Sequence, residues 1–494
     1  MSSRDDGSAA GRRSNTGYIG GLAIAVYVAA VAYLLYGVDR AETGALLLAV
    51  GLTIPGYLTA ASSRHEALAF RLGLLLRIAA VLAFPLLSDD VYRFLWDGAL
   101  WWEGIHPLSQ TPEVLAGSSA GAAFAKTHAT LLAEMNSRAY FTVYPPGSQV
   151  VFAAAGRLAA HVYWGAVALK ACLLVGELAL WRVLRGSGPT HPPGVGTKLY
   201  WLSPLAIVEV CGNGHFEGLA ILGAVVAYRL LQAPPSYPRR PRPLLAALSL
   251  ATGTLTKLVP LLLTPAFALA LLWRRSGTNA PAARVWDWRG ALGFTLVVLL
   301  AVGIGLGAFV ATADVSGFGE SLDLYFRNFE FNGSLYAAAG YLGRLYKGWN
   351  WIAVVGPAMG GLASCAILVT AGLRQWRGLR LAETLLWCMT AYLACATTVH
   401  PWYFLYLLAL GSLTRYRWPF VLGGTAFLSY AAYGVDPVAV PTGALLLEYG
   451  PAVLVGAWEV GRSRQPRRRG EDDVLDEEEG PEAEVEAPDR VRVP

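Results

Sequence analysis

Two adjacent carboxylates, Asp89 and Asp90, directly follow a long apolar run and begin the sequence D-D-V-Y-R-F-L-W-D-G. A carboxylate at a membrane surface, just outside a spanning helix, can accept the proton of a hydroxyl group. In the alternative interpretation Ser88 caps a helix, and the two acids occupy its first turn, where the helix dipole favours anions. That alternative explains one acid readily and two less well. Asp90 is therefore the candidate general base, with Asp89 as its alternate.

Other polar side chains occur further along in short turns beside proline or glycine, and Arg93 can pair with Asp89 or Asp97 at helical spacing. Cationic and hydrogen-bonding groups at such positions can bind a substrate and stabilise negative charge. The candidate substrate-binding residues are Arg93, His215, Glu217, Lys257, Arg327, His400 and Tyr403. A simpler interpretation stays open, in which Lys257 only extends toward the membrane surface and His400 only caps a helix.

The composition indicates a membrane protein. Of 494 residues, 55% are hydrophobic and only 15% are charged, and the mean hydropathy is +0.44. Apolar segments near the length that crosses a bilayer recur along the chain, which predicts an all-α polytopic membrane protein with about 12–14 transmembrane helices. The first segment has no small-residue cleavage site after it and is expected to be a retained helix. The five cysteines lie in apolar segments and are expected to pack there.

Charge predicts the orientation. If the spans cross alternately, the arginine clusters all fall on one side, which the positive-inside rule assigns to the cytoplasm together with both termini. The candidate residues then share the extracytoplasmic face of the inner (plasma) membrane. The net charge of +5 reflects cytoplasmic loops, so no nucleic-acid partner is expected.

Three parts follow along the chain: a disordered cytoplasmic segment at 1–17, a membrane domain at 18–460, and a charged, disordered cytoplasmic tail at 461–494. Within the membrane domain, segment 88–147 is too polar to span. Its aromatic residues predict an amphipathic helix along the outer surface, with Phe94, Trp96, Trp101 and Trp102 in the interfacial belt. Arg77 and Glu177 are intramembrane charges that should face protein, either as a structural ion pair or in a functional role.

The first-loop sequence, followed by G-I-H-P-L, Y-P-P-G, H-F-E and H-P-W-Y, resembles the bacterial members of the C-type glycosyltransferase superfamily (GT-C). The polyprenyl-phosphate-mannose-dependent mannosyltransferases of the cell envelope are similar in particular. The resemblance covers about Tyr18 to Val460. It implies an inverting transfer of a sugar, in which Asp90 or Asp89 is the base. His106 stands where relatives more often have Asn, and the short spans between Lys198 and Trp273 leave the acceptor pocket undefined.

The implied partners are a polyprenyl-phosphate sugar donor, a lipid or glycan acceptor and the lipid bilayer. A lipid-borne donor needs no nucleotide-binding domain, which agrees with the lack of a nucleotide-binding motif in the sequence. No cofactor is expected: a divalent metal could bridge Asp89 and the donor phosphate, but His215 with Glu217 is too small a ligand set to assert one.

Two alternatives remain. One is a transporter or flippase of lipid-linked or small polar solutes, which would bind its substrate near the bilayer midplane on broken helices. The other is a polymerase or ligase of lipid-linked glycans, which would also act on the outer face. Placement of the polar residues at the outer ends of spans, without paired halves, favours the transferase.

Overall fold

The computed structural model describes residues 6–186, 194–232, 242–275, 284–311, 313, 319, 329–348, 351–436 and 438–464. These residues are mostly helical. In the first half the helices are α1 (Asp6–Tyr36), α2 (Thr43–Ser62), α3 (Glu66–Leu82), α4 (Asp90–Trp102), α5 (Pro112–Gly117), α6 (Ala122–Thr127), α7 (Ala129–Glu134), α8 (Pro146–Gly156), α9 (Val162–Arg185), α10 (Val195–Trp201), α11 (Pro204–Ala206), η1 (Ile207–Gly212) and α12 (Glu217–Leu231).

The second half continues in the same way and adds one short hairpin. Its elements are α13 (Pro243–Thr256), η2 (Val259–Leu263), α14 (Thr264–Leu272), β1 (Trp273–Arg275), β2 (Arg284–Trp286), α15 (Trp288–Val310), α17 (Ser334–Lys347), α18 (Ile352–Trp376), α19 (Leu381–Cys395), η3 (Pro401–Phe404), α20 (Leu405–Gly411), α21 (Trp418–Thr425), η4 (Ala426–Gly434) and α22 (Thr442–Arg464). In the hairpin Trp273 pairs with Trp286 in antiparallel register. All five cysteines are free.

In the described part of the chain, four helical segments are long and apolar enough to cross a membrane: Tyr18–Tyr36, Thr43–Ser62, Trp288–Val310 and Ile352–Trp376. A fifth crossing is formed if Pro204–Gly212 and Glu217–Leu231, bent by 114°, make one span. Leu300 and Ile304 on α15 are 60% and 70% exposed, as side chains that face lipid would be. The protein is thus an α-helical membrane protein, and the count of about 12–14 spans stays a prediction.

Helices α3 and α9 run antiparallel and define two ends of the bundle. At one end Arg185 forms an ion pair with Glu66 (2.6 Å). At the other end the ammonium of Lys170 donates to the carbonyls of Ala80 (3.1 Å) and Ala83, where α3 finishes. The buried lysine therefore caps the negative end of the α3 dipole. We call the first end the basic end and the second the α4 end.

Other turns meet at the basic end. Lys198 donates to the carbonyl of Ser63 (2.6 Å), and Arg374 binds Glu383 (2.9 Å) at the start of α19. Arg229, near the end of α12, donates to the carbonyl of Leu184 (2.7 Å). Helices α3, α9, α12 and α19 therefore each have one terminus at this end, and arginines gather there, as the sequence predicts.

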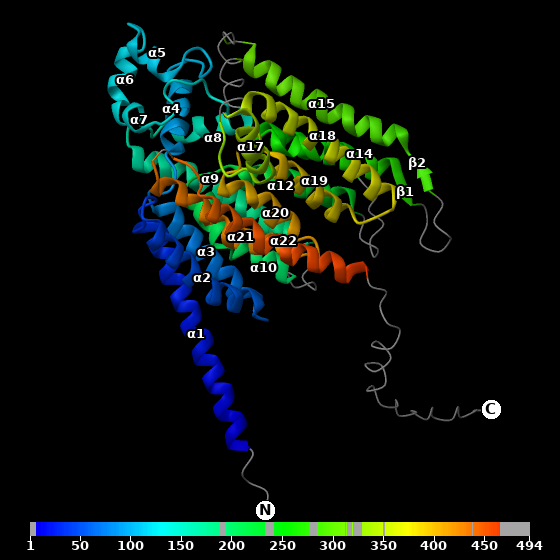
Figure 1. The fold of residues 1–494 in the computed structure, drawn as a ribbon. Helices are drawn as coiled ribbons and strands as arrows, with labels where there is room; N and C mark the ends of the chain where they lie inside the picture. Colours follow the sequence, from blue (N-terminus) through cyan, green and yellow to red (C-terminus); the bar gives the residue numbers. More distant parts are fainter. Residues whose placement is uncertain are drawn as a thin grey trace, which may run out of the picture.

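Helix α4 corrects the prediction of an amphipathic helix on the outer surface. Phe94 and Trp96 are buried, with exposed fractions of 1% and 0%, while Trp102 is 59% exposed. Trp96 packs edge-on against Phe124 of α6, and the opposite side of the helix packs on α8. Helices α5, α6 and α7 lie over α4 at one corner of the molecule (Figure 1). Aromatic side chains on two sides of α4 are covered by protein, so Phe94 and Trp96 belong to the core rather than to an interfacial belt.

Close backbone contact joins α4 to α8. A Cβ atom on Gly98 would lie 2.0 Å from the carbonyl oxygen of Phe152, and one on Gly156 would lie 2.1 Å from the carbonyl carbon of Gly98. Only glycine permits this approach. The crossing fixes the height of α4 on α8 and hence the position of Asp90 at its first turn.

The intramembrane charges Arg77 and Glu177 form an ion pair (2.8 Å) and are fully buried, which confirms that both face protein. The guanidinium also stacks on the ring of Trp201 (3.9 Å), and Tyr200 donates to the second carboxylate oxygen (2.8 Å). With all of its partners inside the bundle, this pair joins α3, α9 and α10 as a structural network.

The chain ends differ in part from the prediction. Helix α1 begins at Asp6, inside the segment 1–17 that was expected to be disordered. Helix α22 ends at Arg464, and residues 465–494 of the predicted tail lie outside the described residues.

Candidate functional site

The two acids that open α4 do not cap it. Asp89 occupies the N-cap position, yet its side chain accepts no capping hydrogen bond and instead pairs with Arg40 (2.8 Å). Asp90 accepts a hydrogen bond from the hydroxyl of Tyr144 (3.1 Å). The Asp89 and Asp90 side chains are 31% and 27% exposed. Both carboxylates thus remain accessible at the α4 end. Ser88 Oγ accepts the backbone N–H of Asp90 (3.3 Å), and Asp90 lies in the first turn of α4, so the interpretation in which Ser88 caps the helix stays open.

Arg40, in the turn between α1 and α2, is a site residue that the sequence analysis missed. Its guanidinium lies over the ring of Tyr433 (5.0 Å) while it binds Asp89. Burial lowers the pKa of Arg40, but the hydrogen bond and the charge of Asp89 outweigh it and raise the pKa overall. Arg40 could have been found from the sequence, because it is a single arginine on the predicted side of the membrane that has no arginine clusters.

Arg93 pairs with Asp97, whereas Asp89 pairs with Arg40. Arg93 binds Asp97 (2.8 Å) and donates to the carbonyls of Ser137 (3.1 Å) and Tyr140 (2.8 Å). Its pairing with Asp97 was one of the two predicted, and the side chain is buried. Arg93 therefore ties α4 to the following loop and lies behind the two acids at the start of α4.

A broken helix brings the next residues to the same place. Helix η1 is a π-helix, and the chain bends by 114° between it and α12. Gly214 at the bend has φ = 86°, a conformation that favours glycine. The turn delivers His215 and Glu217 to the α4 end, both buried. Short π-helical segments are frequent at functional sites.

His215 lies between the accessible Asp90 and a buried acid, Glu209. Its Nδ1 is 3.0 Å from Glu209 Oε2, and its Nε2 is 3.8 Å from Asp90 Oδ2. Glu209 also receives hydrogen bonds from the Asn213 amide (3.0 Å) and from the Tyr430 hydroxyl (2.8 Å). The sequence analysis did not single out these three partners of the candidate site.

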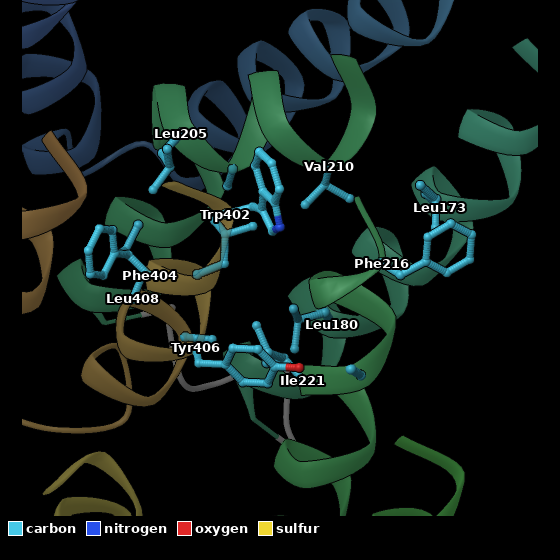
Figure 2. Packing of buried hydrophobic residues seen from close by; sticks show 14 of the residues in the cluster. Leu173, Leu180, Leu205, Val210, Phe216, Ile221, Trp402, Phe404, Tyr406 and Leu408 are labelled. Carbon is cyan, nitrogen blue, oxygen red and sulfur yellow. The ribbon is translucent and has the colours of Figure 1, made fainter. Parts of the chain in front are cut away.

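The ring of Trp402 stacks on the imidazole of His215, with the ring centroids 3.6 Å apart. Figure 2 shows Trp402 among the buried side chains of Leu205 and Val210. Stacking on a core residue fixes the plane of the His215 ring.

Lys257 and His400 both lie close to the ring of Tyr403. The ammonium of Lys257 forms an ion pair with Glu217 and lies 5.2 Å from the ring of Tyr403. His400 stacks on Trp402 (4.4 Å) and meets Tyr403 edge-on (5.7 Å). The structure therefore brings Lys257, His400 and Tyr403 together, as the hypothesis of one binding site requires, although Lys257 already has a buried acidic partner.

The charge state of His400 differs from that of a cationic phosphate ligand. Burial, with smaller contributions from the neighbouring His215 and Lys257, lowers the pKa of His400 to about 3. At neutral pH this imidazole is neutral, so it can bind an anion only as a hydrogen-bond donor. Arg327, the remaining candidate cation, lies outside the described residues.

His106 takes a structural place in the loop after α4. Its Nδ1 accepts a hydrogen bond from the backbone N–H of Leu108 (3.1 Å), and its ring lies between Trp101 and Phe309 at 5.0 and 4.9 Å. Burial lowers the pKa of His106. The side chain therefore shapes the loop as a neutral ring.

The candidate site is defined by its side chains. Among the described residues, no three or more His, Cys, Asp or Glu side chains gather in a way that could hold a metal ion. A cavity of about 410 Å³ is lined by Gln232, Trp273, Gln375 and Arg380 and lies at the basic end. Because none of the candidate residues lines it, the candidate site rests on side-chain geometry alone.

Comparison of the chain with protein-family models, with curated proteins and with solved structures found no match.

Proposed function

We propose that this protein is a membrane glycosyltransferase that moves a hexose, with mannose as the first sugar to test, from a polyprenyl-phosphate donor to an envelope lipid or glycan. The observation that carries the proposal is the pair of accessible carboxylates, Asp89 and Asp90, at one end of a membrane-embedded helical bundle. Asp90 accepts a hydrogen bond there from the Tyr144 hydroxyl, and His215 Nε2 lies 3.8 Å from its carboxylate. The resemblance of the first-loop sequence to C-type glycosyltransferases supports the same reaction.

In the proposed reaction Asp90 accepts the proton of the acceptor hydroxyl while that oxygen attacks the anomeric carbon. The bond from this carbon to the phosphate oxygen breaks, and the phosphate leaves with the electron pair. A single displacement of this kind inverts the anomeric centre. The developing charge on the phosphate needs donors nearby. Among the described cations at this end, Arg40 binds Asp89 and Lys257 lies beside Tyr403, and neutral His400 adds a hydrogen-bonding group near Tyr403.

Orientation is part of the proposal. The positive-inside rule assigns the basic end to the cytoplasm, which puts the α4 end on the extracytoplasmic face of the plasma membrane and both termini inside. A polyprenyl-phosphate sugar presents its head group at that outer surface.

A transporter or flippase of lipid-linked or small polar solutes is the second candidate, and one observation favours it. The bent pair of η1 and α12 is a broken helix with the buried polar residues Glu209 and His215 at its break, a feature that transporters share. Uptake or flipping of a labelled lipid-linked sugar in proteoliposomes, without a new glycosidic product, would support this candidate.

The test of the proposal is direct. Purified protein in proteoliposomes is incubated with radiolabelled polyprenyl-phosphate mannose, glucose, galactose or arabinose and with envelope lipid extract. We expect one donor to give a labelled product and an equal amount of free polyprenyl phosphate. Release of neither product from any donor, with well-folded protein, would refute the transferase.

A further inference from the structure

Behind Asp90 lies a chain of polar groups that a single general base does not need. From the surface inward it runs from Asp90 to His215 and then to Glu209, at 3.8 and 3.0 Å. Glu209 is fully buried, and His215 is 2% exposed. Two buried polar side chains in line with an accessible carboxylate are costly to maintain without a role.

We infer that Glu209 and His215 form a proton relay, in which His215 Nε2 receives the proton that Asp90 takes from the acceptor hydroxyl. The inference rests on the proposed glycosyl transfer. It adds two positioning residues that act through Asp90.

The hydrogen bonds around Glu209 set the tautomer of His215. Asn213 Nδ2 donates to Oε2 (3.0 Å) and the Tyr430 hydroxyl donates to Oε1 (2.8 Å), so the carboxylate accepts from each side. Because both of its oxygens accept hydrogen bonds, the same carboxylate accepts the Nδ1–H of the imidazole as well. Nε2 is then the nitrogen with the free lone pair.

That nitrogen is buried and makes no hydrogen bond with the described residues. A buried nitrogen without a partner carries a desolvation cost, and here it is the atom that faces Asp90 Oδ2. The separation of 3.8 Å is longer than a hydrogen bond, and such contacts commonly shorten when substrate binds. Stacking on Trp402 and the bend at Gly214 leave the ring aimed at the carboxylate.

The proton balance closes without a further reactant. The acceptor O–H proton moves to Asp90 and then to His215 Nε2, which makes an imidazolium that the negative charge of Glu209 stabilises. The electron pair of the broken bond leaves with the polyprenyl phosphate. Asp90 is again an anion, and the imidazolium later releases its proton to solvent through Asp90.

The other charged groups near His215 do not replace this role. His400 stays neutral because burial lowers its pKa to about 3, and Lys170 binds the end of α3. Lys257 pairs with Glu217, and the Tyr433 ring lies under the guanidinium of Arg40.

The experiment compares kcat, the KM for donor and the pH profile in purified wild type, His215→Gln and Glu209→Gln. Gln keeps the polar character of each position. We expect kcat to fall about 100-fold in His215→Gln and about 10-fold in Glu209→Gln, with an unchanged KM, because relay groups act on the proton and not on donor binding. Glu209→Asp should recover part of the loss. His128→Gln, at a histidine between α6 and α7 and outside the site, is the matched control and should keep the wild-type values.

The pH profile separates a relay from a structural role. In the wild type, kcat should fall on the acidic side of its pH profile, since transfer needs the free lone pair of Nε2. In His215→Gln this acidic limb should move to the lower pH range of a carboxylate. If His215→Gln keeps the wild-type limb, the relay is refuted even when kcat falls. If His215→Gln does not fold, Glu209→Gln decides: wild-type kcat in that variant refutes the relay. Loss of transfer in Asp90→Asn alone would leave the proposed function standing without the relay, while full transfer in Asp90→Asn would remove both.

Discussion

Replacing Gly98 by alanine tests whether the contact between α4 and α8 positions the site. The new Cβ would lie 2.0 Å from the carbonyl oxygen of Phe152, whereas ordinary contact begins at 3.4 Å. The two helices must therefore separate by about 1.4 Å along that line, because the obstacle is backbone and cannot rotate away. Asp90, two turns earlier on α4, would move with the helix.

Two opposing terms set the size of the effect. Overpacking of a well-packed contact costs about 1–3 kcal/mol. Alanine in a helix interior gains up to about 1 kcal/mol over glycine. The steric term wins, so we expect the free energy of unfolding of Gly98→Ala to fall by about 1–2 kcal/mol. A displacement near 1 Å at a catalytic group can cost about 100-fold in rate, so transfer should fall more than stability.

The assay is reversible unfolding in mixed detergent micelles, run beside the transfer assay. Gly117→Ala is the matched control, since nothing lies within 4 Å of its added Cβ in the same loop region. It should change stability by less than about 0.5 kcal/mol. Gly98→Ala with unchanged stability and unchanged transfer would show that the crossing of α4 and α8 is not the constraint described.

Three further predictions concern the buried ion pair, the orientation and the donor site. Glu177→Gln leaves its arginine partner buried without a counter-charge and should lower the free energy of unfolding by about 3–5 kcal/mol; a loss under about 1 kcal/mol would contradict a structural pair. In a cysteine-free background, Ser119→Cys should react in intact cells with a membrane-impermeant thiol reagent and Ser463→Cys should not; the reverse pattern would put the α4 end inside. Lys257→Ala should weaken donor binding more than acceptor binding and also destabilise the fold by stranding Glu217. Adding Glu217→Gln should restore the stability but not the donor binding, and recovery of both would make Lys257 purely structural.

The helical membrane class could be predicted because apolar runs of spanning length are a local property of the sequence. The arginine clusters likewise predicted that one end of the bundle is basic, and the contacts of Arg185 and Arg374 agree. The number of spans could not be settled in this way. Segments such as α13, η2 and α14 are short and interrupted at Pro260 and Pro265, so length alone does not show how they lie in the bilayer.

Helix α4 shows why the surface prediction was wrong. An aromatic, mixed-polarity segment has the same pattern whether it lies on a membrane or between layers of protein, and only the packing of α6, α7 and α8 distinguishes the two. One signal in the pattern pointed toward burial: Gly98 lies inside the helix, and a glycine there suits close packing of a second helix.

The contacts of Glu209 and His215 could not be predicted from the sequence for a different reason. Glu209 is a single acid inside an apolar run, which is a signal for function that the sequence analysis passed over. Its partner Tyr430 lies 221 residues away, and the direction of His215 depends on the bend at Gly214. Such long-range pairings follow from the fold and have no local signature.

The most direct test of the central claim is the rate of glycosyl transfer by Asp90→Asn. Asparagine keeps the size of the side chain and can still accept the hydroxyl of Tyr144, but it cannot take a proton. We expect transfer to fall by about two to four orders of magnitude, while Glu103→Gln, which removes an exposed acid at the other end of α4, stays at the wild-type rate. Near-full transfer by well-folded Asp90→Asn, with loss in Asp89→Asn, would exchange the roles of the two acids. Near-full transfer by both variants would contradict the account.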